Sequence, residues 1–275
     1  MPDAANVFSF SRRASYDTRM SWLDMKRIVV GEIMDSPTLD RVEHVRALAG
    51  LRRVNEVSNA VECMLRPIVG MARREGLREI RMLDVACGGG DVPIGVVVAA
   101  GRAGITIHLT LTDRSEVALA HAKEFAGAQG IRVQTVQSDA VVRLPEGTFD
   151  VVTNSLFLHH LERPEVVQVL TNLRNAARPD GGLVVVNDLR RSRAGWLLAW
   201  TACRLLTKSA VVRFDGPASV RAAWTIDEMR STALDAGLTG MHVERAWPWR
   251  MMLVWERTEA PKNSVPQLQD SEVGA

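Results

Sequence analysis

The sequence predicts an α/β fold in which helices cover both faces of a doubly wound, mainly parallel sheet of seven strands. Between Glu79 and Val186, apolar runs rich in β-branched residues alternate with segments of helical periodicity, which is the pattern of repeated strand–helix–strand units. Each apolar run is followed by a polar or glycine-rich turn. Such turns gather at the carboxyl edge of a parallel sheet, where these folds place their ligands.

Seven apolar runs account for the strands. Five of them alternate with helices, and two later ones complete the sheet. The predicted strands are Ile80–Val85, Ile105–Thr112, Arg132–Gln137, Phe149–Thr153, Leu183–Val186, Met241–Arg245 and Arg250–Glu256.

Helices are predicted between these strands at Val92–Ala100, Ser115–Ala128 and Glu165–Ala176. A further helix begins at Thr225-Ile226-Asp227-Glu228, where Thr and Glu have the spacing of a capping box, and ends at Gly237.

Three regions follow from this pattern. Residues 1–75 form an N-terminal helical cap or lid, residues 76–258 form the core with a helical insertion at 190–225 after the fifth strand, and residues 259–275 form a polar, disordered tail. Within the cap, Asp40–Val69 has apolar residues near helical spacing and predicts one amphipathic helix. It is interpreted either as a structural cap or as a lid that lines the substrate.

Composition limits the partners. The net charge of +2 is spread along the chain, so no nucleic-acid partner is expected. Three cysteines without a C-x-x-C pair predict neither a disulfide framework nor a thiolate zinc site. The N-terminus lacks the apolar stretch of a secretory signal and the run Trp196–Cys203 is too short for a membrane span. A cytoplasmic protein without stable membrane insertion is expected, as a monomer or a homodimer.

The segment Leu83-Asp84-Val85-Ala86-Cys87-Gly88-Gly89-Gly90-Asp91 joins a predicted strand to a predicted helix. A glycine-rich turn there lets the backbone approach a nucleotide-like ligand. Asp113 ends the second strand, where it can accept hydrogen bonds from ribose hydroxyls, and Asp139 ends the third strand near adenine. Several carboxylates near the loop repel a pyrophosphate, whereas they attract the ammonium and sulfonium groups of S-adenosylmethionine.

In these motifs the chain resembles the large methyltransferase family that includes the ubiquinone and menaquinone methyltransferases. The resemblance spans Arg81 to Gly182, and includes Leu-Thr-Asp at 111–113, Ser-Asp-Ala at 138–140 and the stretch from Phe149 to Leu161. It implies a Rossmann-like fold and S-adenosylmethionine as cofactor. Ala86 stands where the family usually has its first glycine. The cofactor-binding residues that the resemblance implies, or that the loop itself provides, are Asp84, Ala86, Gly88, Gly90, Asp113, Arg114, Asp139, Ala140, Asn154 and Ser155.

The region from Gly195 to Thr225, with Phe214-Asp215-Gly216-Pro217, is similar to methyltransferases that accompany bacterial type III polyketide synthases, as is Met34-Asp35-Ser36-Pro37. That similarity implies O-methylation of a small hydrophobic phenolic or polyketide-like acceptor, which is the function we expect. Two alternatives stay open: C-methylation of a quinone precursor, and a catalytically silent protein that binds the cofactor as a partner or regulator.

His160, and after it His159, are the candidate bases, because an imidazole that follows the fourth strand can take the acceptor's proton. The alternative is that the pair only lines the cofactor pocket. One acid with two amides, Asp188 with Asn154 and Asn187, makes a poor magnesium site, so no metal is expected. For the acceptor, the apolar insertion and its neighbours predict contacts from Trp200, Arg221 and Arg191.

Overall fold

The computed structural model describes residues 25–35, 39–40, 42–43, 46–47, 49–50, 53, 55 and 59–257. The predicted tail at 259–275 and most of the predicted cap lie outside these residues.

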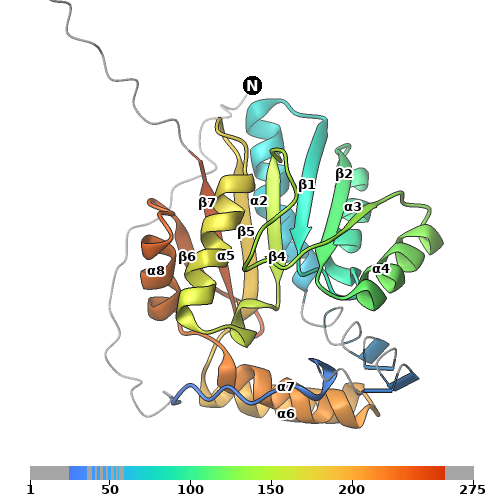
Figure 1. Ribbon diagram of the computed structural model, residues 1–275, viewed down its shortest axis with the longest axis vertical. Coiled ribbons are helices and arrows are strands. Elements are labelled where there is room, and N and C mark those ends of the chain that lie inside the picture. The colour runs from blue at the N-terminus through green and yellow to red at the C-terminus, as the bar shows by residue number, and fades with distance from the viewer. Residues whose placement is uncertain are drawn as a thin grey trace, which may run out of the picture.

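The described chain builds one seven-stranded sheet, drawn in Figure 1, with the strand order β3-β2-β1-β4-β5-β7-β6. The strands from β1 to β5 are parallel where they pair, and β7 runs antiparallel to both β5 and β6. The predicted doubly wound, mainly parallel seven-stranded fold is therefore confirmed. The strands are β1 (Glu79–Val85), β2 (Thr106–Asp113), β3 (Gln134–Gln137), β4 (Val151–Ser155), β5 (Leu183–Leu189), β6 (His242–Ala246) and β7 (Arg250–Glu256).

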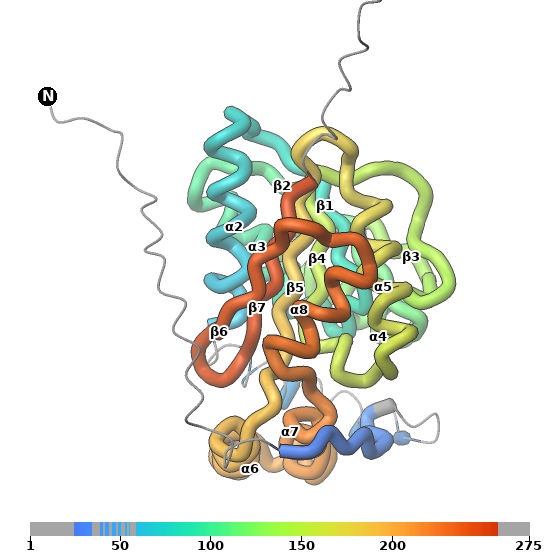
Figure 2. The backbone as a smooth tube through the Cα atoms, turned by 90° about the vertical axis from the view of Figure 1, so that its left-hand side faces the viewer, coloured from blue at the N-terminus to red at the C-terminus, as the bar shows by residue number. Residues whose placement is uncertain are grey.

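Side-chain alternation along the strands divides the core into two layers. In β1, Ile80 and Met82 face the layer that contains α2 (Ala60–Glu75), α3 (Asp91–Arg102) and α4 (Glu116–Ala128). Leu83 and Val85 face the layer of α5 (Arg163–Ala176) and α8 (Ile226–Asp235). Figure 2 shows α2 and α3 on one side of the sheet and α5 and α8 on the other. Because both faces are covered, the central strands are apolar almost throughout, as in other buried parallel sheets.

Two predicted helices differ from the structure. The amphipathic pattern of Asp40–Val69 predicted one helix, but Asn59 adopts a left-handed conformation with φ of 55°, and α2 begins at Ala60 and extends to Glu75. Asparagine tolerates this conformation better than most residues, and the helical periodicity did not reveal the break. The insertion predicted to hold one short helix contains two, α6 (Arg193–Leu206) and α7 (Ala210–Ala222). The capping box at Thr225 and Glu228 is present as predicted.

The carboxyl ends of the parallel strands face α6 and α7, which lie across the lower end of the sheet in Figure 1. Residues 25–35, including the short 3-10 helix η2 (Ile33–Asp35), run alongside α7 in both views. A second 3-10 helix, η3 (Leu158–His160), follows β4 and packs against α7. The N-terminal segment, η3 and α7 thus meet at the ligand-binding edge of the sheet. Among the described residues, no helix has the length and apolarity to cross a membrane.

Candidate active site

The loop between β1 and α3 has the backbone of a ligand cradle. Ala86, Gly88 and Gly90 have φ of 55°, 53° and 73°. The left-handed conformation strains Ala86, since alanine carries the Cβ that glycine lacks. At Gly90 a side chain is excluded by space as well, because an added Cβ would lie 2.9 Å from Cβ of Ala122. The loop is thus held in a conformation that places backbone groups, rather than side chains, at its surface.

Asp113 fastens this loop to the end of β2. One carboxylate oxygen accepts the Gly88 N–H at 2.9 Å, and the other accepts the Ser115 N–H at 2.9 Å. Asp139 is exposed at the end of β3 and accepts the Val141 N–H, and the adjacent Ala140 is buried. The carbonyl of Arg114 accepts a hydrogen bond from the Gln137 side chain. These predicted cofactor residues therefore come together along the carboxyl ends of β1, β2 and β3.

The N-terminal cap reaches the same loop through Asn55. Its side-chain amide donates to Asp91, the first residue of α3, at 2.9 Å, and its oxygen accepts a hydrogen bond from the buried Arg250 of β7. The cap is thereby tied to the cofactor loop and to the far half of the sheet.

Asp84 lies beneath the loop and is buried. Its carboxylate accepts a hydrogen bond of 2.6 Å from Thr153 of β4. Burial raises the pKa of Asp84 to about 7, because the charged form loses its hydration, and the nearby carboxylates of Asp91 and Asp113 add to the rise against the lowering by Thr153. A cationic ligand group beside Asp84 would stabilise its ionised form.

Several buried polar atoms at the ends of β4 and β5 have no hydrogen-bond partner within the described part of the chain. They are Asn154 Oδ1, Ser155 Oγ and both side-chain polar atoms of Asn187. Burial of an unpaired polar atom is costly, and such atoms are rare in folded proteins. Their position beside the loop after β1 fits a ligand rich in donors and acceptors. The residues present therefore fit an adenosylmethionine-like cofactor.

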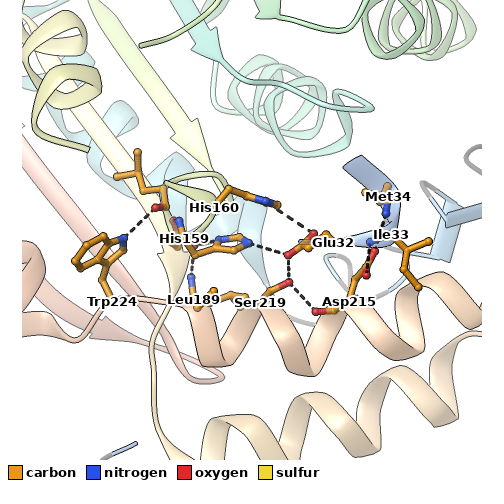
Figure 3. Close-up of polar contacts among 12 residues, drawn as sticks. Glu32, Ile33, Met34, His159, His160, Leu189, Asp215, Ser219 and Trp224 are labelled. Atoms are coloured by element: carbon orange, nitrogen blue, oxygen red, sulfur yellow. Dashed lines mark hydrogen bonds and ion pairs between the residues drawn. The ribbon is translucent and has the colours of Figure 1, made fainter. Parts of the chain in front are cut away.

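A polar cluster is formed by His159 and His160 on η3, Asp188 on β5, and Glu32 in the N-terminal segment. Figure 3 labels the two histidines and Glu32, which face one another. His159 Nδ1 lies 2.7 Å from Asp188 Oδ1, and its Nε2 lies 3.6 Å from Glu32 Oε1. His160 Nε2 lies 3.8 Å from the other carboxylate oxygen of Glu32. His159 is buried, whereas 23% of the His160 side chain is exposed. His160 is therefore the member of the pair that a bound acceptor can reach.

The buried pairs of the cluster shift the pKa values of its members. Burial lowers the pKa of His159, but the attraction of the Asp188 and Glu32 carboxylates for the charged ring is larger than this effect. The pKa of His159 therefore lies well above its usual range. Burial raises the pKa values of Glu32 and Asp188, but the facing imidazoles outweigh it and leave both below their usual range. His159 is therefore an imidazolium between two carboxylates, which holds Glu32 in place.

Two side chains on α7, the acceptor Asp215 and the donor Ser219, position Glu32. The Asp215 carboxylate accepts the N–H groups of Ile33 and Met34 at 2.9 Å and 3.0 Å. The Ser219 hydroxyl contacts both the Glu32 carboxylate and the Asp215 carbonyl oxygen. The segment is thus bound to α7 through the Glu32 side chain and through the N–H groups of the two residues that follow it.

Two arginines anchor the beginning of this segment. Arg27 donates to the carbonyl oxygens of Leu161 and Ala222, both at 2.7 Å, and its guanidinium lies 4.1 Å from the ring centroid of Trp224. Arg191 donates to the carbonyl oxygens of Met25 and Ala223 and to the Glu228 carboxylate.

Of the residues predicted to bind the acceptor, Arg191 is buried, and its guanidinium donates to the acceptors on Met25, Ala223 and Glu228. Trp200 is 39% exposed on α6, with the Arg204 guanidinium 3.9 Å above its ring. Arg221 is half-buried near the end of α7, where its carbonyl oxygen accepts the Ile28 N–H. Arg221 stands on α7, the helix that packs against η3, whereas Trp200 stands on α6, which packs against α7.

Glu32 is the site residue that sequence reasoning missed. It stands in a segment without a motif, far along the chain from the histidines, and only the docking of residues 25–35 on α7 brings it to them. Asp188, interpreted from the sequence as a strand-end hydrogen-bonding group, accepts from the ring and the backbone N–H of His159.

A cavity of about 890 Å³ lies elsewhere, over β1, β2 and β3 toward the beginnings of these strands, with Arg81, His108, Gln134 and Asp150 in its wall. Its wall contains none of the predicted cofactor residues, and Asp150 is already paired with Arg178. We assign the chemistry to the opposite edge of the sheet, where the loop after β1 and the polar cluster lie.

Comparison with known proteins places the chain in a family. The profile of a family described as a methyltransferase domain matches residues 82–181. The ubiquinone biosynthesis O-methyltransferase of Pectobacterium carotovorum is 31% identical over 176 residues, which cover 62% of this chain and 69% of that protein. The enzyme of the same name from Colwellia psychrerythraea is 29% identical over 144 residues, covering 51% of this chain and 54% of the relative. The chain therefore spans about half the length of the Colwellia protein.

Among solved structures, an O-methyltransferase family 2 protein from Planctomyces limnophilus, determined in complex with apigenin, superimposes with a TM-score of 0.58 at 19% identity. The alignment covers 81% of this chain and 63% of that one. The chain belongs to the class I S-adenosylmethionine-dependent methyltransferases. The fold class, the family and the cofactor predicted from the sequence are thereby confirmed.

Proposed function

We propose that the protein transfers a methyl group from S-adenosylmethionine to a hydroxyl oxygen of a small, hydrophobic, phenolic or polyketide-like acceptor. One observation carries the proposal: the glycine-rich loop after β1 and the cluster of Glu32, His159 and His160 meet at the same edge of the sheet. A cofactor cradle alone would serve any methyltransferase. An adjacent carboxylate–imidazole cluster provides, in addition, groups that can take the proton of a neutral hydroxyl.

The cofactor is held by residues whose placement matches its chemistry. Asp84 faces the amino-acid end, Asp113 and Arg114 flank the ribose, and Asp139 with Ala140 borders adenine. When bound, S-adenosylmethionine supplies an electrophilic methyl group on its sulfonium. Asn154 and Ser155, whose buried oxygens lack partners among the described residues, line the cofactor beside the reacting group.

In this proposal His160 is the base and Glu32 positions it. Both ring nitrogens of His159 face carboxylates and its ring is buried, so it has no free position for an acceptor. His160 faces Glu32 through Nε2, and its side chain is partly exposed. The resulting order Asp188, His159, Glu32, His160 runs from the buried end of β5 to the exposed side of the site. Methyl transfer needs alignment as well as proton removal, and the contacts that fix Glu32 on α7 restrict the ring that faces the acceptor.

Oxygen is preferred over carbon as the methylated atom because of the relatives. Two curated relatives of the chain are O-methyltransferases of ubiquinone biosynthesis, and the Planctomyces structure was determined with apigenin, a phenolic compound. C-methylation of a quinone precursor is distinguished by the position of the new methyl group.

The test uses the purified full chain with S-adenosylmethionine and a panel of phenols, alkylresorcinols and hydroxylated quinone precursors, with products identified by tandem mass spectrometry. We expect a mass increase of one methyl group on oxygen. His160→Ala should lower turnover by about 10²- to 10⁴-fold with nearly unchanged cofactor affinity, and the exposed His108→Ala is the matched control. Products methylated only on carbon, or a fully active His160→Ala variant, would contradict the O-methylation or the base assignment.

The role of the insertion is tested separately. Trp200→Ala and Arg221→Ala should raise KM for the acceptor without changing the affinity for S-adenosylmethionine, provided that circular dichroism shows both variants to be folded. Wild-type KM in both would limit the acceptor site to η3, residues 25–35 and the adjoining turns of α7.

A further inference from the structure

We propose that Glu32, His159 and His160 form a binding site for one divalent transition-metal ion of the zinc type. The proposed site lies beside Asn154, Asn187 and Asp188, where the sequence predicts no magnesium site, and has two imidazoles and one carboxylate as ligands. Two histidines, one glutamate and an open position are a composition found in catalytic zinc sites.

The spacing of the ligand atoms supports the site. The Nε2 atoms of His159 and His160 lie 3.6 Å and 3.8 Å from the two oxygens of Glu32, and one ligand atom from each residue lies within 4.8 Å of the others. Zinc bonds of about 2.0–2.2 Å at a tetrahedral angle separate neighbouring ligand atoms by about 3.3–3.5 Å. A small inward movement of the three side chains brings their ligand atoms to this spacing. His160 has room for it because its side chain is partly exposed.

Asp188 supplies the second observation. Its carboxylate lies 2.7 Å from His159 Nδ1, which fixes the proton of that ring on Nδ1 and directs Nε2 toward Glu32. Metal-binding histidines almost always donate their other ring N–H to a carboxylate or carbonyl in this way, since it orients the ring and increases its basicity. His159 therefore offers Nε2 to the cation while Asp188 holds the other nitrogen of the same ring.

The charge of the cluster also favours a cation. Two carboxylates, Glu32 and Asp188, face the histidine pair, and the Arg27 guanidinium, which donates to the His159 carbonyl oxygen, is itself paired with Glu162 at 3.1 Å. A divalent cation between the two imidazoles and Glu32 places positive charge directly against the Glu32 carboxylate. A cation in this place replaces the proton between His159 and Glu32.

The consequence for the reaction rests on the proposed function. A cation held by three protein ligands keeps a position for the acceptor's hydroxyl oxygen and promotes the loss of its proton, as metal ions do for bound water. The proton then leaves to solvent, and the oxygen keeps the electron pair that forms the new bond to the methyl carbon. In the metal-bound state Nε2 of His160 is a ligand and the cation promotes the loss of the acceptor's proton, and the role of His160 as base given above is that of the metal-free protein.

Metal binding can be measured without cofactor or acceptor, so its failure is separate from a failure of methyl transfer. The full chain is stripped with a chelator and titrated with Zn²⁺ by calorimetry, and with Co²⁺ by visible absorption, which reports coordination by nitrogen. We expect one tight site per chain for both ions and no such site for Mg²⁺, which prefers oxygen ligands.

Variants decide whether these residues make the site. Glu32→Gln and His160→Ala should weaken Zn²⁺ binding by at least about tenfold, and Asp188→Asn by about 10- to 100-fold. His108→Ala removes an exposed histidine that is paired with a glutamate and should bind as the wild type does. Circular dichroism checks that each variant is folded. The proposal is overturned if the wild type binds no stoichiometric Zn²⁺, or if Glu32→Gln and His160→Ala bind it as tightly as the wild type. Either result leaves the cluster as a proton-holding network only.

Discussion

Replacement of Asp113 tests the cofactor site most directly. In the structure its two carboxylate oxygens accept one backbone N–H each, from Gly88 in the loop after β1 and from Ser115 ahead of α4. In the proposed function, the remaining acceptor capacity of the carboxylate serves the ribose hydroxyls of the cofactor. Asp113→Ala therefore removes both the tie that shapes the loop and the acceptor for the ribose hydroxyls.

The magnitude follows from these contacts. A hydrogen bond to a charged group contributes about 1.5–3 kcal/mol, and solvent at the partly exposed Asp113 extends the lower end of that range to about 1 kcal/mol. The predicted loss of binding free energy is about 1–3 kcal/mol, or roughly 5- to 150-fold in Kd. The Asp113→Asn variant keeps one side-chain oxygen, and with it one of the two backbone contacts. It should therefore lose less binding free energy for the cofactor than the alanine variant does.

Calorimetric titration with S-adenosylhomocysteine measures the affinity, and chemical denaturation measures any accompanying loss of stability. Asp227→Ala is the matched control, since this aspartate is exposed on α8 and its side chain pairs with Arg230, away from the cofactor loop. An Asp113→Ala variant that is folded and binds with wild-type affinity would refute the assignment of Asp113 to the cofactor.

Three further predictions follow from the same edge of the sheet. Gly90→Ala should lower the free energy of unfolding by about 1–3 kcal/mol in urea, because the new Cβ meets Ala122 at 2.9 Å with φ of 73°; an unchanged midpoint would contradict the packing. Affinity for S-adenosylmethionine should rise as pH increases through about 7, where Asp84 ionises and can pair with the cofactor's ammonium group, and Asp84→Asn should abolish that rise. Arg191→Met should destabilise the protein by about 3–5 kcal/mol, since it leaves three buried or half-buried acceptors without their donor; a neutral result would show that water replaces the guanidinium.

The fold and the cofactor loop could be predicted because their signals are local. A buried parallel strand is a short apolar run, and the cradle at Ala86, Gly88 and Gly90 is a run of small residues between a strand and a helix. The capping box at Thr225 and Glu228 is likewise a pattern within four residues. Each of these depends on the conformation of neighbouring residues, so the order of the amino acids is enough to identify it.

The sequence could not reveal where the helical patterns stop or what covers the site. Asn59 breaks the predicted helix by a single left-handed residue, which changes neither the apolar spacing before it nor that after it. Trp200 stands in a strongly apolar helix, which predicted a pocket, yet its ring lies on the exposed side of α6 against Arg204. Periodicity shows that a face is apolar, but the partner of that face depends on segments far away in the chain.

The sequence by itself determined the sheet, the class of cofactor and the pair of histidines after β4. The tertiary structure alone decided that Glu32 faces both imidazoles. That contact depends on Asp215 and Ser219 of α7 binding the backbone and side chain of residues 32–34, and on Arg27 and Arg191 anchoring the segment before them. Asp215, Ser219 and Arg191 are far from Glu32 in the chain, and Arg27 acts through the distant carbonyl oxygens of Leu161 and Ala222. Their joint effect therefore exists only once α7 has packed against η3 and the carboxyl edge of the sheet has formed.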